Sequence, residues 1–140
     1  MNERYVLDAW ALLAFLQKEE PAGSRVRQLV QEAQNQVVRL FVSIINLGEV
    51  YYRIGKTRGQ DQADETLEEL RRLPITILSA ENESVWAAAR LRINRLMSYA
   101  DAFAATAARQ LGAILVTGDT ELMKLEDELR LEKLSRTKNN

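Results

Sequence analysis

Short runs of apolar and β-branched residues alternate with longer segments of helical period along this chain, and that alternation limits the possible folds more than any other feature. It is typical of an α/β domain, in which helices cover a mainly parallel sheet. The continuous apolar run at 37–42 indicates a strand buried on both faces, and Pro74 indicates that the next strand lies at an edge. Strands are predicted at residues 5–7, 37–42, 75–78, 113–117 and 129–134.

The segments between these strands have helical character. In one of them, residues 85–97, apolar side chains that include Trp86, Ile93 and Leu96 recur at helical spacing and predict a face in the core. A chain of 140 residues is long enough for one domain. We expect a domain over residues 1–134 and a polar, frayed tail at 135–140. Helices are predicted at residues 9–17, 25–33 after a break at Pro21, 46–54, 60–72, 85–97 and 98–111, with a short one ending near 125.

The absence of two residue types restricts the chemistry available to the chain. It contains no His and no Cys, which excludes Ser-His-Asp and Cys-His catalysis, disulfides, and metal sites built on imidazole or thiolate. Its 19 Lys and Arg are balanced by 20 Asp and Glu, so no global positive field draws it to nucleic acid or anionic lipid. With no recognisable targeting segment or membrane span, we expect a cytoplasmic protein.

Acidic residues stand where predicted strands give way to helices. Asp8 follows the first strand and Asp119 follows the fourth. Glu49 and Asp101 lie in the predicted first turns of two later helices. Because ligands of open α/β sheets bind beyond the carboxyl ends of the strands, we expect these four acids on one face. Thr117 offers a hydroxyl to the same place, although a β-branched residue is also common at the end of a strand.

Helix capping is the structural alternative for each acid. Asp8 and Asp119 could be plain N-caps, the run from Asn46 to Glu49 fits a capping box, and Ser98 could cap the helix that carries Asp101. Capping does not explain the apolar surroundings of Asp8 and Asp101, where a carboxylate is costly unless its charge is compensated. Four clustered carboxylates would need a cation, and oxygen-only ligands suit Mg²⁺ or Mn²⁺, which support phosphodiester hydrolysis without histidine.

These residues resemble the acidic motifs of PIN-domain nucleases, and particularly of VapC-type toxins from toxin-antitoxin pairs. The motifs are Asp8 in VLDAWALLAFL, Glu49 in INLGEVYYRI, Asp101 in SYADAFAATAA and Asp119 in LVTGD. The resemblance covers almost the whole chain. It implies a three-layer α/β/α domain with a parallel sheet of four or five strands, Mg²⁺- or Mn²⁺-dependent endoribonuclease activity, a homodimer, and a cognate protein antitoxin.

The resemblance also implies a role for each residue. Asp8 and Asp101 would bind the metal directly, and Glu49 would bind it directly or through water and help to orient the attacking water. Asp119 would complete the site with support from Thr117. Hydrolysis would leave a 5′-phosphate and a 3′-hydroxyl. Glu121, two residues beyond Asp119, is a lesser candidate.

One departure from the family pattern concerns the residues after the first acid. Many relatives have Thr or Ser there, whereas this chain has Ala9 and Trp10, and Trp10 suits core packing better than base stacking. Basic side chains that could contact RNA phosphates near the site are few, and each also suits a solvated helix end. They are Arg53, Lys56, Arg58 and Lys124.

Other functions remain open at this point. Two of them lack a residue that they require. A phosphoacceptor domain would need paired acids after the first strand, but Asp8 follows Leu7, and an aspartyl phosphatase would need an acid where Trp10 stands. A PIN-like RNA-processing nuclease without an antitoxin, or an inactive module that binds metal or protein, would retain the same motifs.

Overall fold

The sheet is parallel throughout and contains five strands. A computed structural model describes residues 2–137 of the chain. The strands are β1 (Glu3–Leu7), β2 (Val38–Ser43), β3 (Ile75–Leu78), β4 (Ile114–Thr117) and β5 (Leu131–Lys133), in the spatial order β3-β2-β1-β4-β5. The first strand therefore lies at the centre, between β2 and β4, and β3 is at an edge, as Pro74 predicts.

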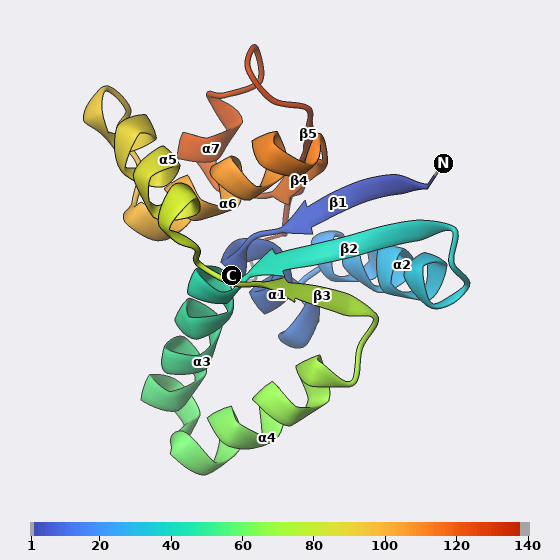
Figure 1. The fold of residues 1–140 in the computed structure, drawn as a ribbon. Coiled ribbons are helices and arrows are strands. Elements are labelled where there is room, and N and C mark those ends of the chain that lie inside the picture. Colours follow the sequence, from blue (N-terminus) through green and yellow to red (C-terminus); the bar gives the residue numbers. More distant parts are fainter. Residues whose placement is uncertain (1, 138–140) are drawn as a thin grey trace.

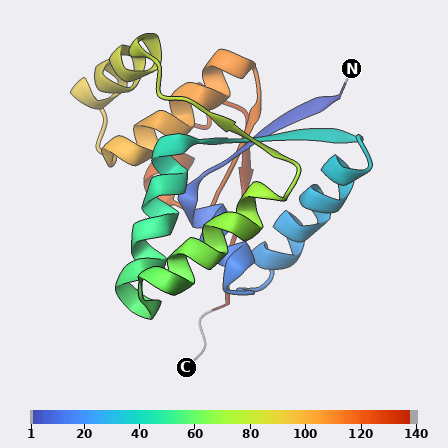
Figure 2. The same ribbon diagram turned by 60° about the horizontal axis from the view of Figure 1, so that its bottom comes forward.

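Helices cover both faces of this sheet, which confirms the three-layer α/β/α architecture (Figures 1 and 2). One face packs against α1 (Ala9–Leu16), α2 (Ala22–Gln34), α3 (Ile44–Arg58) and α4 (Gln60–Arg71), and the other against α5 (Asn82–Ile93), α6 (Tyr99–Leu111) and α7 (Thr120–Met123). No helix within residues 2–137 has the length and apolar character that a membrane crossing requires.

Two apolar cores follow from the alternation of side chains along the strands. Leu7 of β1 and Val116 of β4 face the first layer of helices, while their neighbours Val6 and Leu115 face the second. The second core is rich in alanine, because α6 contributes small buried side chains such as Ala104 and Ala108. Both faces are thereby buried at the carboxyl-terminal ends of β1 and β2, whose residues there are mainly apolar, whereas Arg4 and Arg39 nearer the start of each strand are exposed.

Several predicted element boundaries are wrong. Helix α2 begins at Ala22 rather than at 25, with Pro21 as its N-cap. Helix α3 begins at Ile44 and continues through Gly55 to Arg58, so the glycine does not break it. The chain turns only at Gly59, whose φ of +90° favours glycine.

The segment after the third strand differs most from the prediction. Helix α5 ends at Ile93 instead of 97. Trp86, Ile93 and Leu96, which the helical spacing placed in the core, are 60%, 74% and 81% exposed. From the same segment the second core takes Ala88 and Met97, with Val85 and Leu91 packed against it, and the three exposed side chains lie outside it.

The end of the described chain is held in place where a frayed tail was expected. An antiparallel bridge pairs Arg136 with Pro21. Ala22 N donates to Ser135 O at 3.1 Å, and Thr137 N donates to Glu20 O at 2.8 Å. The rest of the predicted tail, 138–140, lies outside the described residues.

Candidate active site

The parallel pairing of β1 and β4 brings the first and last acidic motifs together. Leu7 is in register with Val116, so Asp8 and Thr117 emerge side by side at the carboxyl ends of the two strands. Both are fully buried, at 1% and 0% exposure, and the Thr117 hydroxyl donates a short hydrogen bond to Asp8 Oδ2. Two residues that are 109 positions apart in sequence therefore form one buried polar pair.

Asp8 is both a helix cap and part of the acidic site. Its Oδ1 accepts a hydrogen bond from Ala11 N at 2.8 Å, which makes it the N-cap of α1. Burial raises the pKa of the Asp8 carboxyl from 3.8 to about 7, although the hydrogen bonds from Thr117 and Ala11 oppose this rise. The negative charges of Asp101 and Asp119 raise its pKa further. Helix capping and membership of the acidic cluster therefore do not exclude each other at Asp8.

Asp119 is likewise a cap and a member of the cluster. Its Oδ1 accepts from Glu121 N at 2.8 Å and from Leu122 N at 3.3 Å, at the start of α7. Its own backbone N–H donates to the Thr117 hydroxyl oxygen at 3.0 Å. Thr117 therefore connects the first acid to the fourth through its hydroxyl.

Asp101 lies in the first turn of α6, as predicted, and Ser98 is the cap of that helix. The Ser98 hydroxyl oxygen accepts from Asp101 N at 3.0 Å. Partial burial raises the pKa of the Asp101 carboxyl from 3.8 to about 6, and the charges of Asp119 and Glu49 raise it further, while Ser98 lowers it. Asp101, Asp119 and Glu49 line the same cavity, which accounts for the effect of the two neighbouring charges on Asp101.

Glu49 reaches the same region from α3, but not from its first turn. Ser43 is the N-cap of α3, so Glu49 lies in the second turn and the predicted capping box at Asn46 is wrong. Asn46 is instead fully buried, and its Nδ2 donates to Ala100 O at 3.0 Å, which ties the start of α3 to the start of α6. Glu49 Oε2 accepts from Arg53 Nε at 3.0 Å.

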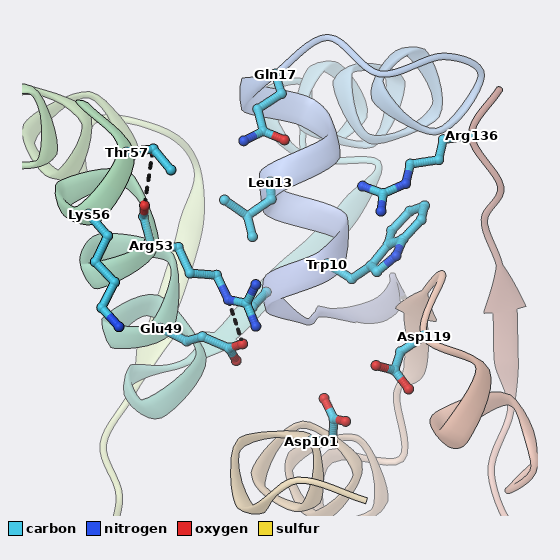
Figure 3. Close-up of a pocket in the computed structure, with 11 residues that line it drawn as sticks. Trp10, Leu13, Gln17, Glu49, Arg53, Lys56, Thr57, Asp101, Asp119 and Arg136 are labelled. Atoms are coloured by element: carbon cyan, nitrogen blue, oxygen red, sulfur yellow. Dashed lines mark hydrogen bonds and ion pairs between the residues drawn. The ribbon is translucent and has the colours of Figure 1, made fainter. Parts of the chain in front are cut away.

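The acids surround a cavity of about 420 Å³. Figure 3 shows Glu49, Asp101 and Asp119 extending toward this cavity from three different elements. Asp8 and Thr117 are not among its lining residues; both are buried, and the Thr117 hydroxyl accepts a hydrogen bond from the backbone N–H of Asp119, which does line the cavity. The lining is formed by Ala9, Trp10, Leu13, Gln17, Glu49, Arg53, Lys56, Thr57, Asp101, Asp119 and Arg136.

Of the predicted basic residues, two line the cavity and two do not. Arg53 and Lys56 belong to its wall, whereas Arg58 and Lys124 are absent from it. Lys124 forms an ion pair with Glu121 at 3.1 Å on the surface, and Glu121, the lesser acidic candidate, does not line the cavity either. Sequence reasoning missed Arg136, because nothing in the polar end of the chain indicates that it returns to the site.

The donor chemistry of the site fits a hard divalent cation. Every candidate ligand is an oxygen, and a bound positive charge would offset both the burial that raises the pKa values of Asp8 and Asp101 and the smaller contribution from repulsion among the acids. As the side chains stand, the part of the chain that the structure describes holds no group of three or more acidic residues arranged to grip a metal ion. Glu49 is held by Arg53, and both oxygens of Asp8 are already hydrogen-bonded.

Trp10 packs directly against the turn that carries the fourth acid. A Cβ at Gly118 would lie 2.3–2.4 Å from three consecutive atoms of the six-membered ring of Trp10, closer than real Cβ atoms come to any neighbour. Near-equal distances to three ring atoms place the glycine over the face of the ring. Glycine at this position therefore permits the close approach of the indole.

We expect Gly118→Ala to destabilise the protein by about 1–3 kcal/mol, because the indole of Trp10 must move to admit the methyl group. Urea denaturation measures the change. Gly48→Ala is the matched control, since its Cβ would meet nothing within 4 Å on helix α3. There the same substitution should stabilise by about 0.5–1 kcal/mol through helix propensity. Equal effects of the two substitutions would contradict the packing argument.

Comparisons with known proteins agree with this geometry. The sequence matches the family model of the PIN domain over residues 5–128. None of the curated proteins matches it in sequence. The match to the family model covers the strand ends and all four acidic motifs.

Solved structures of the same fold come from toxin-antitoxin systems. VapBC2 from Rickettsia felis, bound to a promoter DNA fragment, aligns with a TM-score of 0.72 and 19% identity over 94% of this chain and 99% of that chain. DNA-bound VapBC from Salmonella typhimurium aligns with a TM-score of 0.69 and 18% identity over 95% and 98%. The sarcin-ricin loop cleaving toxin VapC20 from Mycobacterium tuberculosis aligns with a TM-score of 0.69 and 14% identity over 86% and 93%.

Proposed function

Since the chain belongs to the PIN-domain family, whose members are nucleases that generally use divalent metal ions, we propose that it is an Mg²⁺- or Mn²⁺-dependent endoribonuclease. One observation carries this proposal above the others. Glu49, Asp101 and Asp119 line a single cavity from three separate elements, and the backbone N–H of Asp119 donates to Thr117, which forms a buried pair with Asp8.

We assign the metal to the acids of this cavity. Asp8 and Asp101 would be its direct ligands, Asp119 would complete the site, and Glu49 would bind the ion or orient the attacking water. When bound, the cation would neutralise the carboxylates and polarise the phosphate that is attacked. Thr117 holds Asp8 in place through its hydroxyl. To bind the ion or the attacking water, Glu49 must release its hydrogen bond from Arg53. The Arg53 guanidinium would then be free to contact the substrate.

We further propose that the protein is the toxin of a toxin-antitoxin pair. The support is the likeness to VapBC complexes and to a VapC toxin over most of the chain. The toxin from Mycobacterium tuberculosis cleaves the sarcin-ricin loop, so a structured RNA with an exposed loop is a suitable first substrate here. The products would carry a 5′-phosphate and a 3′-hydroxyl.

A protein partner and a second copy of the chain complete the proposal. Large apolar side chains on and after α5 are exposed, among them Trp86 at 60%, Ile93 at 74% and Leu96 at 81%. Exposed apolar groups that lie close together in sequence favour a protein contact over free solvent. We assign this surface to homodimer formation and the neighbourhood of the cavity to a cognate antitoxin.

The test is cleavage of a structured RNA by the purified chain with Mn²⁺ or Mg²⁺ and with EDTA. Cleavage should require the metal, and the melting temperature should rise when Mn²⁺ replaces EDTA, because an ion that binds only the folded state stabilises it. An inactive metal-binding module is the alternative that the missing hydroxyl after Asp8, where Ala9 and Trp10 stand, leaves open. It would give the melting shift without cleavage. Absence of both effects would exclude a metal nuclease.

A nuclease that processes RNA without an antitoxin would pass the same test. The two roles differ in the cell rather than in the reaction. Expression of the active chain alone should arrest growth if it is a toxin, and co-expression of a small protein encoded beside it should restore growth. Growth that continues despite active cleavage would favour the processing role.

A further inference from the structure

The last described residues return to the cavity and fix one side chain at its rim. Backbone hydrogen bonds on each side of Arg136, from Ala22 N to Ser135 O and from Thr137 N to Glu20 O, hold the segment against the start of α2. The main chain of Arg136 is thereby immobilised, although its side chain is exposed. Its guanidinium contributes to the lining of the cavity.

Trp10 supports this guanidinium from below. The guanidinium carbon of Arg136 lies 5.1 Å from the centroid of the Trp10 ring, in the range of a cation–π contact. Gly118 lies against the six-membered ring of the same indole. A nucleobase could not stack on Trp10 where Arg136 and Gly118 already cover it, so the indole acts as a platform for the cation.

Arg136 retains hydrogen-bonding capacity toward the cavity. Its Nη1 donates to Glu19 Oε1 at 2.9 Å, and within residues 2–137 this is the hydrogen bond that its side chain makes. A guanidinium carries five N–H donors in a planar fork, which matches the oxygens of a phosphate. One ion pair to a partly exposed carboxylate therefore leaves most of its donors for a ligand.

The charges around the cavity are arranged in a sequence that a phosphodiester strand could follow. Figure 3 shows Arg53 and Lys56 on one side of α1 and Arg136 with Trp10 on the other, with Asp101 and Asp119 below. Arg53 is paired with Glu49, and the Lys56 ammonium lies 5.6 Å from the Tyr52 ring centroid. A strand that crosses the acids would meet a cation on each side of them.

We propose that Arg136, held on Trp10, binds a phosphate of the RNA strand next to the one that is cleaved. This inference rests on the proposed nuclease function and adds a binding residue to it. Arg136 contacts the substrate directly, whereas Trp10 is a positioning residue that acts through Arg136. The end of the chain thereby completes the substrate-binding surface of a protein that has almost no net charge.

The test is RNA binding measured with cleavage suppressed. A short fluorescein-labelled single-stranded RNA is titrated in Mn²⁺ with the Asp101→Asn protein and with the same protein carrying Arg136→Ala. Loss of one phosphate contact should weaken binding roughly tenfold near 0.1 M salt. It should also reduce the slope of log K against log salt by about 0.7, the value for one contact to a single strand. Arg136→Lys keeps the charge and should keep the slope.

Arg72→Ala is the matched control, because it removes the same charge from an exposed position at the end of α4, outside the cavity. It should change neither the affinity nor the slope. Trp10→Phe keeps a smaller aromatic face and should weaken binding by an intermediate factor. The double variant Trp10→Phe, Arg136→Ala should bind RNA no more weakly than Arg136→Ala alone, since Trp10 acts through Arg136. A melting curve of each variant confirms that it is folded.

The outcomes separate this inference from the proposed function. If Arg136→Ala binds RNA with the affinity and salt slope of Arg72→Ala while the native chain cleaves RNA, Arg136 only fastens the end of the chain and the inference is overturned. If the native chain neither binds nor cleaves RNA in Mn²⁺, the nuclease function and the inference fail together. If the slope of log K against log salt is reduced in the Arg136→Ala protein and not in the Arg72→Ala protein, the result supports both the nuclease function and the role of Arg136.

Discussion

Asp101→Asn should lower kcat/KM for RNA cleavage by at least about 100-fold, the loss of about 3 kcal/mol of transition-state stabilisation. The Asp101 carboxylate extends into the cavity, and its partial burial, together with the charges of Asp119 and Glu49, raises its pKa above the usual range to about 6. The amide has the same shape but no charge to attract a cation. Initial rates of cleavage in saturating Mn²⁺ give the ratio.

Asp61→Asn is the matched control, because Asp61 is an exposed acid in the first turn of α4, away from the cavity. It should retain native activity. The melting temperature of the Asp101→Asn protein in EDTA should not fall, since the backbone N–H of residue 101 still caps onto Ser98. Cleavage at the native rate by a folded Asp101→Asn protein would remove this carboxylate from the reaction.

Asp8→Asn should flatten the dependence of stability on pH in the metal-free protein. The Asp8 carboxyl has a pKa of about 7 when folded, against 3.8 as the usual value, so between these values the folded state binds more protons than the unfolded chain. The free energy of unfolding therefore falls as the pH rises from about 4 to about 7. For Asp8 alone, this difference corresponds to an upper limit on the order of 4 kcal/mol.

At pH 8 the native protein must bury an ionised carboxylate at Asp8, whereas the amide carries no charge. We therefore expect Asp8→Asn to stabilise the metal-free protein by about 1–3 kcal/mol. The gain is smaller than the full amount, since the amide replaces an acceptor of the Thr117 hydroxyl. At pH 5 the advantage should shrink, because the native carboxyl is then protonated. Urea denaturation in EDTA at both pH values measures the difference, and Asp61→Asn should reproduce the native profile. Parallel pH profiles for the native and Asp8→Asn proteins would refute the burial argument.

The fold class and the positions of the strands could be predicted because they depend on strong, local patterns, whereas the order of the strands in the sheet was not predicted. The five strands, the edge position of β3 and the caps at Ser98, Asp8 and Asp119 follow from apolar runs, a proline and polar residues at helix starts. The boundaries near Ala22 and Gly55 were missed because packing against the sheet outweighs weak local breakers. The exposure of Leu96 was missed because periodicity identifies an apolar face but not what covers it.

The acids of the site could be predicted because each stands beside a strand end or a helix start, whose positions follow from sequence. The residues that surround these acids could not be predicted in the same way. Asn46, Trp10 and Arg136 take their roles from contacts with residues far along the chain, such as the hydrogen bond from Asn46 to Ala100. No local signal distinguishes an arginine that returns to a cavity from one that remains in solvent.

The central place of β1 has a consequence for the order in which the protein acquires activity during its synthesis. Asp8 is synthesised before Thr117, its hydrogen-bond partner, which belongs to β4 on the opposite side of β1 from β2. A nascent chain, or a fragment that ends before β4, holds the first acid without the rest of its site. On the nuclease function proposed above, RNA cleavage should therefore begin only after β4 has been made and has paired with β1.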